Sequence, residues 1–190
     1  MQIRFVVVLL ISLAALIVVR SAQAQADKPL EVGVLFSVMQ VDPLGEGPVS
    51  IGARVSYDLP VQRLTVAPEL EFNYFPQNPS GNFGETQLLA GVRAGVKIDQ
   101  FGFFLKARPG LVHFGGGDFT ERNGGSATNF AVDVGGVFEY FVSQRVAIRL
   151  DWGDTMIHFP RPIATGGIPP VKAAGWYHNR QGGGGVSIRF

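Results

Sequence analysis

The sequence predicts an all-β fold, an eight-stranded antiparallel up-and-down transmembrane β-barrel. Three observations favour this fold class. From Leu30 onward, apolar residues recur at every second position, which is the period of a strand and not of a helix. Short turns and long loops alternate along the chain. Only 16% of the 190 residues are charged, against roughly 25% in a typical soluble domain.

The N-terminal segment is predicted to be a signal peptide, residues 1–26, followed by one barrel domain, residues 27–190. A basic start precedes an apolar stretch at 5–19, and small residues then surround two overlapping A-x-A sites, with cleavage after Ala24 or Ala26. The apolar stretch has fifteen residues, which as a helix would reach only about 22 Å of the ~30 Å hydrocarbon core. A permanent helical anchor is therefore the weaker interpretation.

The eight predicted strands share one pattern. One parity holds mainly aliphatic and aromatic residues, the other holds the charged and polar ones, and Gly, Pro, Asn or Asp bound each segment. In order, the strands are residues 30–41, 49–59, 64–75, 86–98, 101–114, 129–141, 145–158 and 177–190. Ten residues at ~3.3 Å each, tilted by ~40°, cover about 25 Å, which matches the apolar band of a membrane barrel.

Individual strands show the pattern with different clarity. The second alternates Val49, Ile51 and Val55 with polar residues, and the third and fourth repeat it. Leu35, Leu89 and Phe104 are lapses, because they fall on the polar parity. Pro68 and Pro109 lie inside strands and lack a ladder donor, so we expect a bulge at each. The glycines of the polar parity are expected to make room for long Arg and Glu side chains.

The connections alternate in length. Residues 60–63, 99–100 and 142–144 are tight turns, whereas residues 42–48, 76–85, 115–128 and 159–176 are longer loops rich in Gly, Pro, Asn and Ser. All the turns therefore lie at one end of the sheet and all the loops at the other. Membrane barrels show this asymmetry, with short periplasmic turns and long extracellular loops.

The charged parity is predicted to face the barrel axis. Alternation alone also fits a soluble β protein with the opposite orientation, which is the outside alternative. However, the strand charges balance at seven basic and seven acidic residues, as a narrow interior requires because an unpaired buried charge costs several kcal/mol. The expected interior ion-pair network comprises Arg54, Glu69, Glu71, Arg93, Lys106, Arg108, Asp133, Arg149 and Asp151.

The tail of the chain resembles that of small bacterial outer-membrane β-barrel proteins of the OmpA transmembrane-domain and OmpX type. The segment 185–190 places Val186, Ile188 and Phe190 on one parity, which looks like the C-terminal signal of that family. Residues 151–155 and 178–179 also resemble the last hairpin of such barrels. The resemblance implies an outer-membrane location, this fold and assembly by the barrel-assembly machinery. It implies no catalytic activity.

Candidate chemistry is sparse. The formal charge of +1 offers no basic surface for nucleic acid, and the absence of Cys excludes disulfides and thiol chemistry. His158 and His178 flank the last loop and could approach one another, but without an acidic partner at ligand spacing we expect no metal or other cofactor. Asp154 with His158 invites comparison with lipid hydrolases. Such an enzyme needs a serine nucleophile, and the only Ser in the last two strands is Ser187, at the opposite end. No catalytic residues are therefore expected.

The expected function is therefore a structural, adhesive or surface-interaction role through the extracellular loops. The loop 159–176, with its apolar residues and prolines, is the best candidate contact. The expected partners are outer-membrane lipid, lipopolysaccharide and the assembly machinery, and the barrel is expected to be a monomer. A narrow porin-like channel for small solutes is the first alternative. A lipid-A-modifying enzyme is the second.

Overall fold

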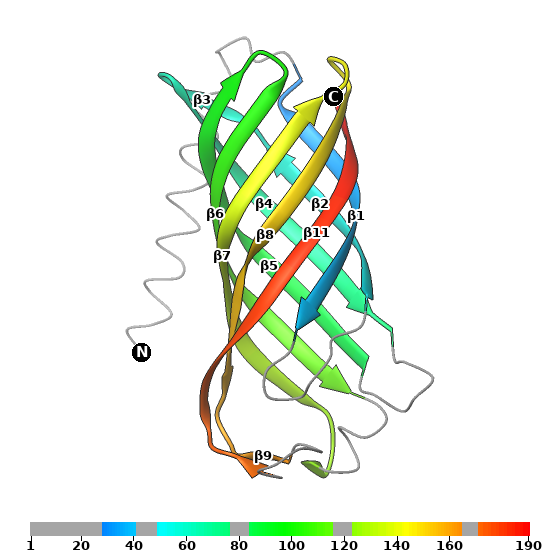
Figure 1. Cartoon of the computed structure of the whole chain (residues 1–190), viewed down its shortest axis with the longest axis vertical. Helices are drawn as coiled ribbons and strands as arrows, with labels where there is room; N and C mark the ends of the chain where they lie inside the picture. Colours follow the sequence, from blue (N-terminus) through cyan, green and yellow to red (C-terminus); the bar gives the residue numbers. More distant parts are fainter. Residues whose placement is uncertain (1–27, 41–48, 77–83, 116–122, 165–170) are drawn as a thin grey trace.

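The alternating segments form the strands of one barrel wall (Figure 1). The computed structural model describes residues 28–40, 49–76, 84–115, 123–164 and 171–190. The strands are β1 (Leu30–Gln40), β2 (Val49–Tyr57), β3 (Leu59–Val61), β4 (Leu64–Phe75), β5 (Gly84–Ile98), β6 (Phe101–Gly115), β7 (Ala127–Phe141), β8 (Val146–Phe159), β9 (Ile163–Ala164), β10 (Val171–Lys172) and β11 (Gly175–Arg189).

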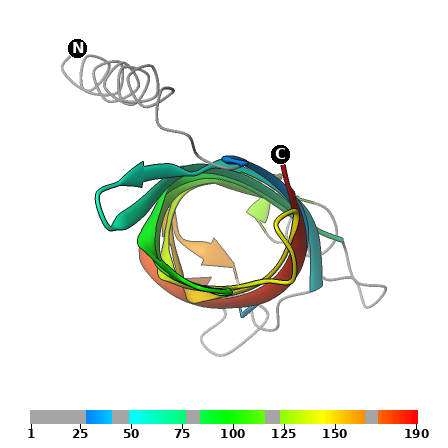
Figure 2. The same ribbon diagram turned by 90° about the horizontal axis from the view of Figure 1, so that it is seen from above.

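The barrel is closed and antiparallel. Around the wall the order is β2, β1, β11, β8, β7, β6, β5, β4 and β3, and pairing of β2 with β4 completes the ring seen along the axis in Figure 2. Asp58 interrupts what is otherwise one strand, so β2 and β3 together form one of the eight wall strands. The predicted all-β fold with eight antiparallel strands is confirmed.

The two ends of the barrel differ in their connections. At the turn end, Gln62 and Asp99 have φ values of 56° and 52°, a left-handed conformation that tight turns use. The predicted turn at 60–63 is shorter than expected, because β3 and β4 pair from Leu59 with Val66 to Val61 with Leu64. At the loop end, β7, β8 and β11 extend furthest, and the small β9–β10 hairpin lies there (Figure 1).

Several predicted segments lie outside the described residues. These are the signal peptide, Val41, the loop 42–48, and the central parts of the three other loops, at 77–83, 116–122 and 165–170. Within the described part of the chain, no helix has the length and apolar character needed to cross a membrane.

The expected bulges at Pro68 and Pro109 are not formed, so that prediction is wrong. The β4–β5 register is the same on both sides of Pro68, and the β6–β7 register is the same on both sides of Pro109. On the other edge of each of these strands the ladder is interrupted at the proline. Pro68 lies opposite Tyr57 and Pro109 lies opposite Ala90, and neither pair is part of a ladder. Because the missing N–H falls at a gap in the ladder, no extra residue has to be inserted.

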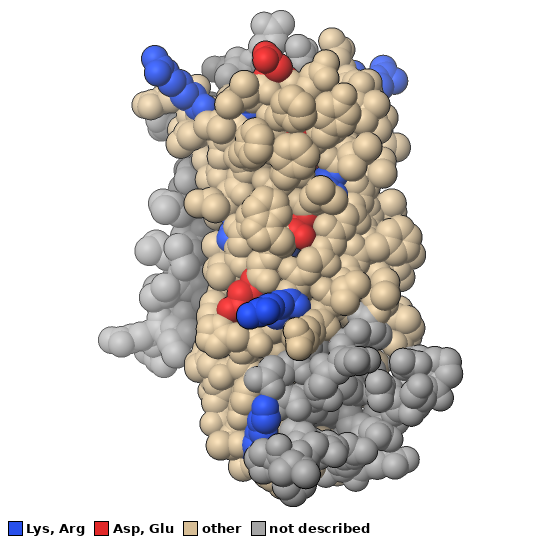
Figure 3. Space-filling model, viewed as in Figure 1, with Lys and Arg blue, Asp and Glu red and all other residues tan. Residues whose placement is uncertain are grey.

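The wall turns its apolar side outward. Leu105 is 75% exposed and Phe36 57%, whereas Arg93, Arg108 and Arg149 are fully buried. Figure 3 shows one face of the resulting outer surface, on which charged groups are few between the two ends. Exposed aliphatic and aromatic side chains in such number are unfavourable in water and favourable in lipid. Closure of the wall through the β2–β4 pairing also removes the free edges of its sheet, which lipid requires.

Candidate functional site: the barrel interior and its loop end

The barrel interior is filled by charged side chains, with Glu69 on β4 at their centre. Arg149 donates to both carboxylate oxygens of Glu69, at 2.6 and 3.0 Å, and Arg108 donates at 2.7 Å. The Nε atoms of Arg54 and Arg93 each lie 3.7 Å from Glu69 Oε2. Four guanidinium groups from four strands therefore share one buried carboxylate, which joins the opposite sides of the wall.

Two aspartates extend this network on β7 and β8. Arg108 contacts Asp133 Oδ2 with Nε at 2.8 Å and Nη2 at 2.6 Å. Lys106 bridges Asp133 and Asp151, with Nζ at 3.1 and 3.3 Å from their oxygens. Arg149 donates from Nε to Asp151 at 2.6 Å. These fork and bridge geometries satisfy the charges that burial would otherwise leave unpaired.

Toward the turn end, Arg93 forms ion pairs with three further carboxylates of the interior. Its guanidinium lies 3.4 Å from Glu31 and 3.2 Å from Asp58, and it also pairs with Glu139. The Phe104 ring lies 4.6 Å from the same guanidinium, a cation–π contact. The apparent lapse at Phe104 is thus an interior aromatic that packs on a buried cation.

A layer of neutral polar side chains follows toward the loop end. Asn73 donates to Glu71 at 2.9 Å and to Gln87 at 2.8 Å, and Glu71 also accepts from Arg108 at 2.5 Å. Gln181 accepts from Thr155 at 2.7 Å. Because Gln87 and Gln181 lie within 3.3 Å of each other, the layer reaches across the interior.

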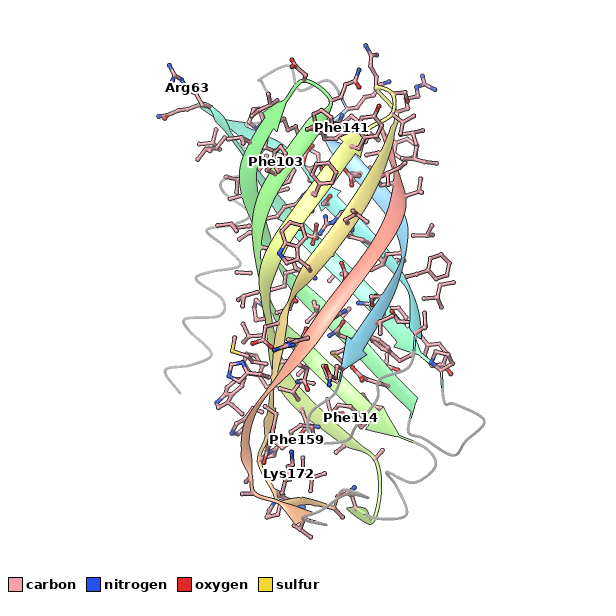
Figure 4. The ribbon with its side chains drawn as sticks, viewed as in Figure 1. Arg63, Phe103, Phe114, Phe141, Phe159 and Lys172 are labelled. Atoms are coloured by element: carbon pink, nitrogen blue, oxygen red, sulfur yellow. The ribbon has the colours of Figure 1, made fainter. Side chains whose placement is uncertain are left out.

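The interior then becomes apolar. Phe114 and Phe159 stack with their ring centroids 5.6 Å apart, as Figure 4 shows near the loop end. The buried apolar core of this layer comprises Met39, Phe75, Val112, Phe114, Ala131, Ile157, Phe159 and Ile163. At the same level the outer side carries polar groups, because His113 hydrogen-bonds Thr128 at 2.8 Å on the outside of the wall. In this part of the barrel, apolar side chains therefore face the interior and polar side chains face outward, as in a soluble β protein.

One carboxyl group is buried in this apolar layer. Glu85 on β5 pairs along the ladders with Phe75 and Phe114, is 1% exposed, and has no hydrogen-bond partner at either oxygen among the described residues. Its outward neighbour Thr86 marks a level beyond the apolar band, which begins at Leu88 on this strand. Burial raises the pKa of Glu85 to about 8, so the side chain is protonated at neutral pH.

The outer wall carries a His–Asp pair near the loop end. His158 and His178, which could have approached one another, have different partners in the structure. His178 Nδ1 lies 2.5 Å from Asp154 Oδ2, whereas His158 packs against Trp176 with centroids 5.0 Å apart. The strand register explains this, because His158 is opposite Trp176. In the described part of the chain, the outward neighbours of the pair on β1, β7, β8 and β11 include no Ser or Thr side chain.

All nine residues of the expected interior network meet inside the barrel. The network also includes Glu31, Asp58 and Glu139. These three residues could be identified from the sequence because they lie on the polar parity of their segments. Glu85 was assigned to a loop, and no sequence feature shows that it lacks a partner among the described residues. Val186, Ile188 and Phe190 are all exposed on the outer side of the wall. The described residues contain no group of three or more His, Cys, Asp or Glu able to hold a metal ion.

The fold is that of the small eight-stranded outer-membrane β-barrels. Outer membrane protein H (OprH) of Pseudomonas aeruginosa is similar, with 15% identity, a TM-score of 0.54, and 85% of this chain and 99% of that chain covered. The N-terminal β-barrel domain of Pseudomonas aeruginosa OprF is 13% identical with a TM-score of 0.52, covering 86% and 98%.

The outer membrane enzyme PagL is also similar in structure, with 14% identity, a TM-score of 0.47, and coverage of 84% of this chain and 99% of that chain. No protein-family model matches the sequence, and no curated protein matches it significantly. At such low identity the likenesses to OprH and to the OprF domain establish the fold alone, and function has to be argued from the sites of this chain.

Proposed function

We propose that the protein is a monomeric integral outer-membrane barrel that acts at the cell surface through its loop end, without catalysis or solute conduction. The observation that carries this proposal is the filled interior. Ionic, neutral polar and apolar layers follow one another along the axis, and each is built from buried side chains of several strands. An eight-stranded interior is only wide enough for such side chains.

The loop end supplies the surface for recognition. There the strands rise beyond the apolar band and carry the β9–β10 hairpin. In this proposal residues 1–26 direct export, and the barrel-assembly machinery recognises the exposed Val186, Ile188 and Phe190. Arg180 is exposed on the outer wall opposite Asp154 in the β8–β11 ladder, where a lipopolysaccharide phosphate would be a suitable partner.

Conductance and surface binding test this function together. The full chain, inserted in planar bilayers, is expected to give no stepwise current in salt solution, while a known porin in the same bilayers does. Cells that display the chain are expected to adhere to another cell or molecular surface to which cells without the chain do not adhere. Reproducible single-channel steps would instead favour the narrow channel.

The enzyme alternative has its own specific observation, the Asp154–His178 pair on the lipid-facing side. Lipid A from cells with and without the protein is expected to have the same mass spectrum. Loss of an acyl chain only in cells that carry the protein would overturn the non-catalytic proposal. Asp154→Asn should then abolish that loss if the pair activates the attacking water.

A further inference from the structure

A pocket opens at the loop end, between the start of β7 and the turn that follows β8. Its volume is about 420 Å³, and residues 123–129 and 159–163 line it. This volume falls in the range of small-molecule sites, roughly 300–1,000 Å³. Figure 4 shows Phe159, one of its lining residues, near the end of the barrel that carries Lys172.

The frame of the pocket is fixed by contacts to the barrel. Asn123 accepts a hydrogen bond from the backbone N–H of Ala164 at 2.9 Å and donates to the same residue's carbonyl at 3.4 Å. On the opposite side, Phe159 and Ile163 belong to the buried apolar core. Because both walls are anchored, the pocket is preformed, and a ligand does not have to order it.

The polar groups that the described residues contribute to the pocket carry no negative charge. Asn129 is 3% exposed, and its amide nitrogen has no hydrogen-bond partner among the described residues. Arg161 is exposed, and no ion pair joins it to a described residue. Ser126 adds a hydroxyl group, and none of the described lining residues is acidic. A buried donor without a partner is unfavourable, so these groups suit a ligand that is anionic and rich in acceptors.

We propose that this pocket binds an acidic sugar unit, a hydroxylated ring that carries one carboxylate. Arg161 pairs with the carboxylate through two parallel N–H···O bonds, since guanidinium and carboxylate match in geometry. Asn129 and Ser126 hydrogen-bond ring hydroxyls. The inference rests on the proposed function, because it needs a loop end that faces the outside of the cell.

Direct binding tests the ligand class. The full chain, refolded in lipid nanodiscs, is titrated with N-acetylneuraminic acid, galacturonic acid and neutral galactose, and binding is followed by calorimetry and saturation-transfer NMR. Both acidic sugars are expected to bind at least about tenfold more tightly than galactose, because hydrogen bonds to a charged group are the stronger ones. Equal affinity for galactose would overturn the proposal.

Two variants and a matched control localise the site. Arg161→Gln is expected to weaken binding of both acidic sugars about tenfold or more, and Asn129→Leu to weaken binding several-fold. Arg63→Gln removes the same charge from the turn hairpin at the opposite end of the barrel (Figure 4) and should change nothing. Unchanged affinity in Arg161→Gln would also overturn the assignment.

The source of the sugar and the topology are tested separately. If the cell's own lipopolysaccharide supplies the acidic sugar, nanodiscs that contain it will compete with free galacturonic acid. If a glycan on another surface supplies it, they will not compete. Labelling of the half-buried Lys172, at the loop end, by a membrane-impermeant reagent on intact cells tests the outward loop end. Failure of labelling overturns the proposed function, whereas failure of sugar binding with successful labelling overturns only this inference.

Discussion

At the scale of single residues, the interior depends on shared charges. Glu69 has no solvent exposure at its side chain and lies within 3.7 Å of guanidinium atoms of four arginines. A buried pair gains little over an apolar replacement of both partners, but removal of one partner leaves the other uncompensated. The energetic importance of Glu69 therefore lies in what its loss would expose.

We predict that Glu69→Gln destabilises the barrel by about 3–5 kcal/mol, because it leaves excess positive charge in the interior. Urea unfolding in lipid vesicles, followed by far-UV circular dichroism, measures the change. Asp99→Asn is the control. Asp99 is an exposed turn acid with φ 52°, a conformation that Asn also tolerates, so its loss should cost less than about 0.5 kcal/mol. Equal effects of the two variants would contradict the prediction.

Glu85 predicts a pH dependence. Its pKa is raised from 4.5 to about 8 in the folded state. Below pH 4.5 both folded and unfolded states are protonated, and the group costs nothing. Between these values the unfolded state ionises first, so stability falls as the pH rises, and the loss levels off above pH 8.

Glu85→Gln should therefore match the wild type at pH 4 and exceed it in stability at pH 8, by about 4 kcal/mol if the whole shift is expressed. The gain should be seen in unfolding of the loop end, because Glu85 lies in the apolar layer there. Trp176 fluorescence in a Trp152→Phe background reports on that end. An equal difference at both pH values would show that ionisation is not the cause.

At the scale of the strands, the inner glycines have a different role from the one expected. A Cβ atom at Gly135 or Gly185 would meet the backbone of the neighbouring strand, and not a long side chain. The tight curvature of a small barrel brings adjacent backbones together on the inside of the wall. On the outside, a Cβ at Gly136 would instead meet the indole ring of Trp152.

Gly136→Ala should move this indole from the wall and destabilise the barrel by about 1–3 kcal/mol through overpacking. Gly182→Ala is the matched control on the same outer face, since a Cβ there meets nothing closer than 3.9 Å. It should be neutral or slightly stabilising. Trp152 emission in a Trp176→Phe background and urea midpoints measure both. A shifted emission in the control variant but not in Gly136→Ala would contradict this account.

The strands, and which of their side chains point inward, could be predicted because the alternation of apolar and polar residues is a local pattern. A shift of one residue would move every side chain to the other face, so the pattern leaves one choice. Strand ends were less certain, as β5, β7 and β11 each begin two residues earlier than predicted. Partners within the network could not be derived, because they depend on register between strands far apart in the sequence. Glu69 and Arg149, eighty positions apart, are an example.

At the scale of the whole molecule, two packing schemes share one wall. The membrane-spanning part has an ionic interior and an apolar exterior. Beyond it, Ile157 and Phe159 face inward while the intervening His158 faces outward, so the scheme is reversed. The loop end is therefore held by an apolar core of its own and is expected to unfold separately from the rest.

Phe159→Ala tests this separation. Loss of the buried ring should cost the loop end about 3–5 kcal/mol and leave the membrane-spanning wall nearly unaffected. In urea, the Trp176 signal of the variant should change well before the Trp152 signal, each measured with the other tryptophan replaced by Phe. Coincident transitions would mean that the barrel unfolds as one unit.

The reversal of polarity also fixes the depth at which the protein sits. A vertical shift toward the outside would move the polar rim of His113 and Thr128 further into water and draw the turn end, with its exposed Asp99, into the acyl region. A shift the other way would submerge Asp154. In a bilayer thicker or thinner than its natural one, the lipids must therefore stretch or compress around the barrel, because a vertical shift of the barrel is unfavourable in both directions.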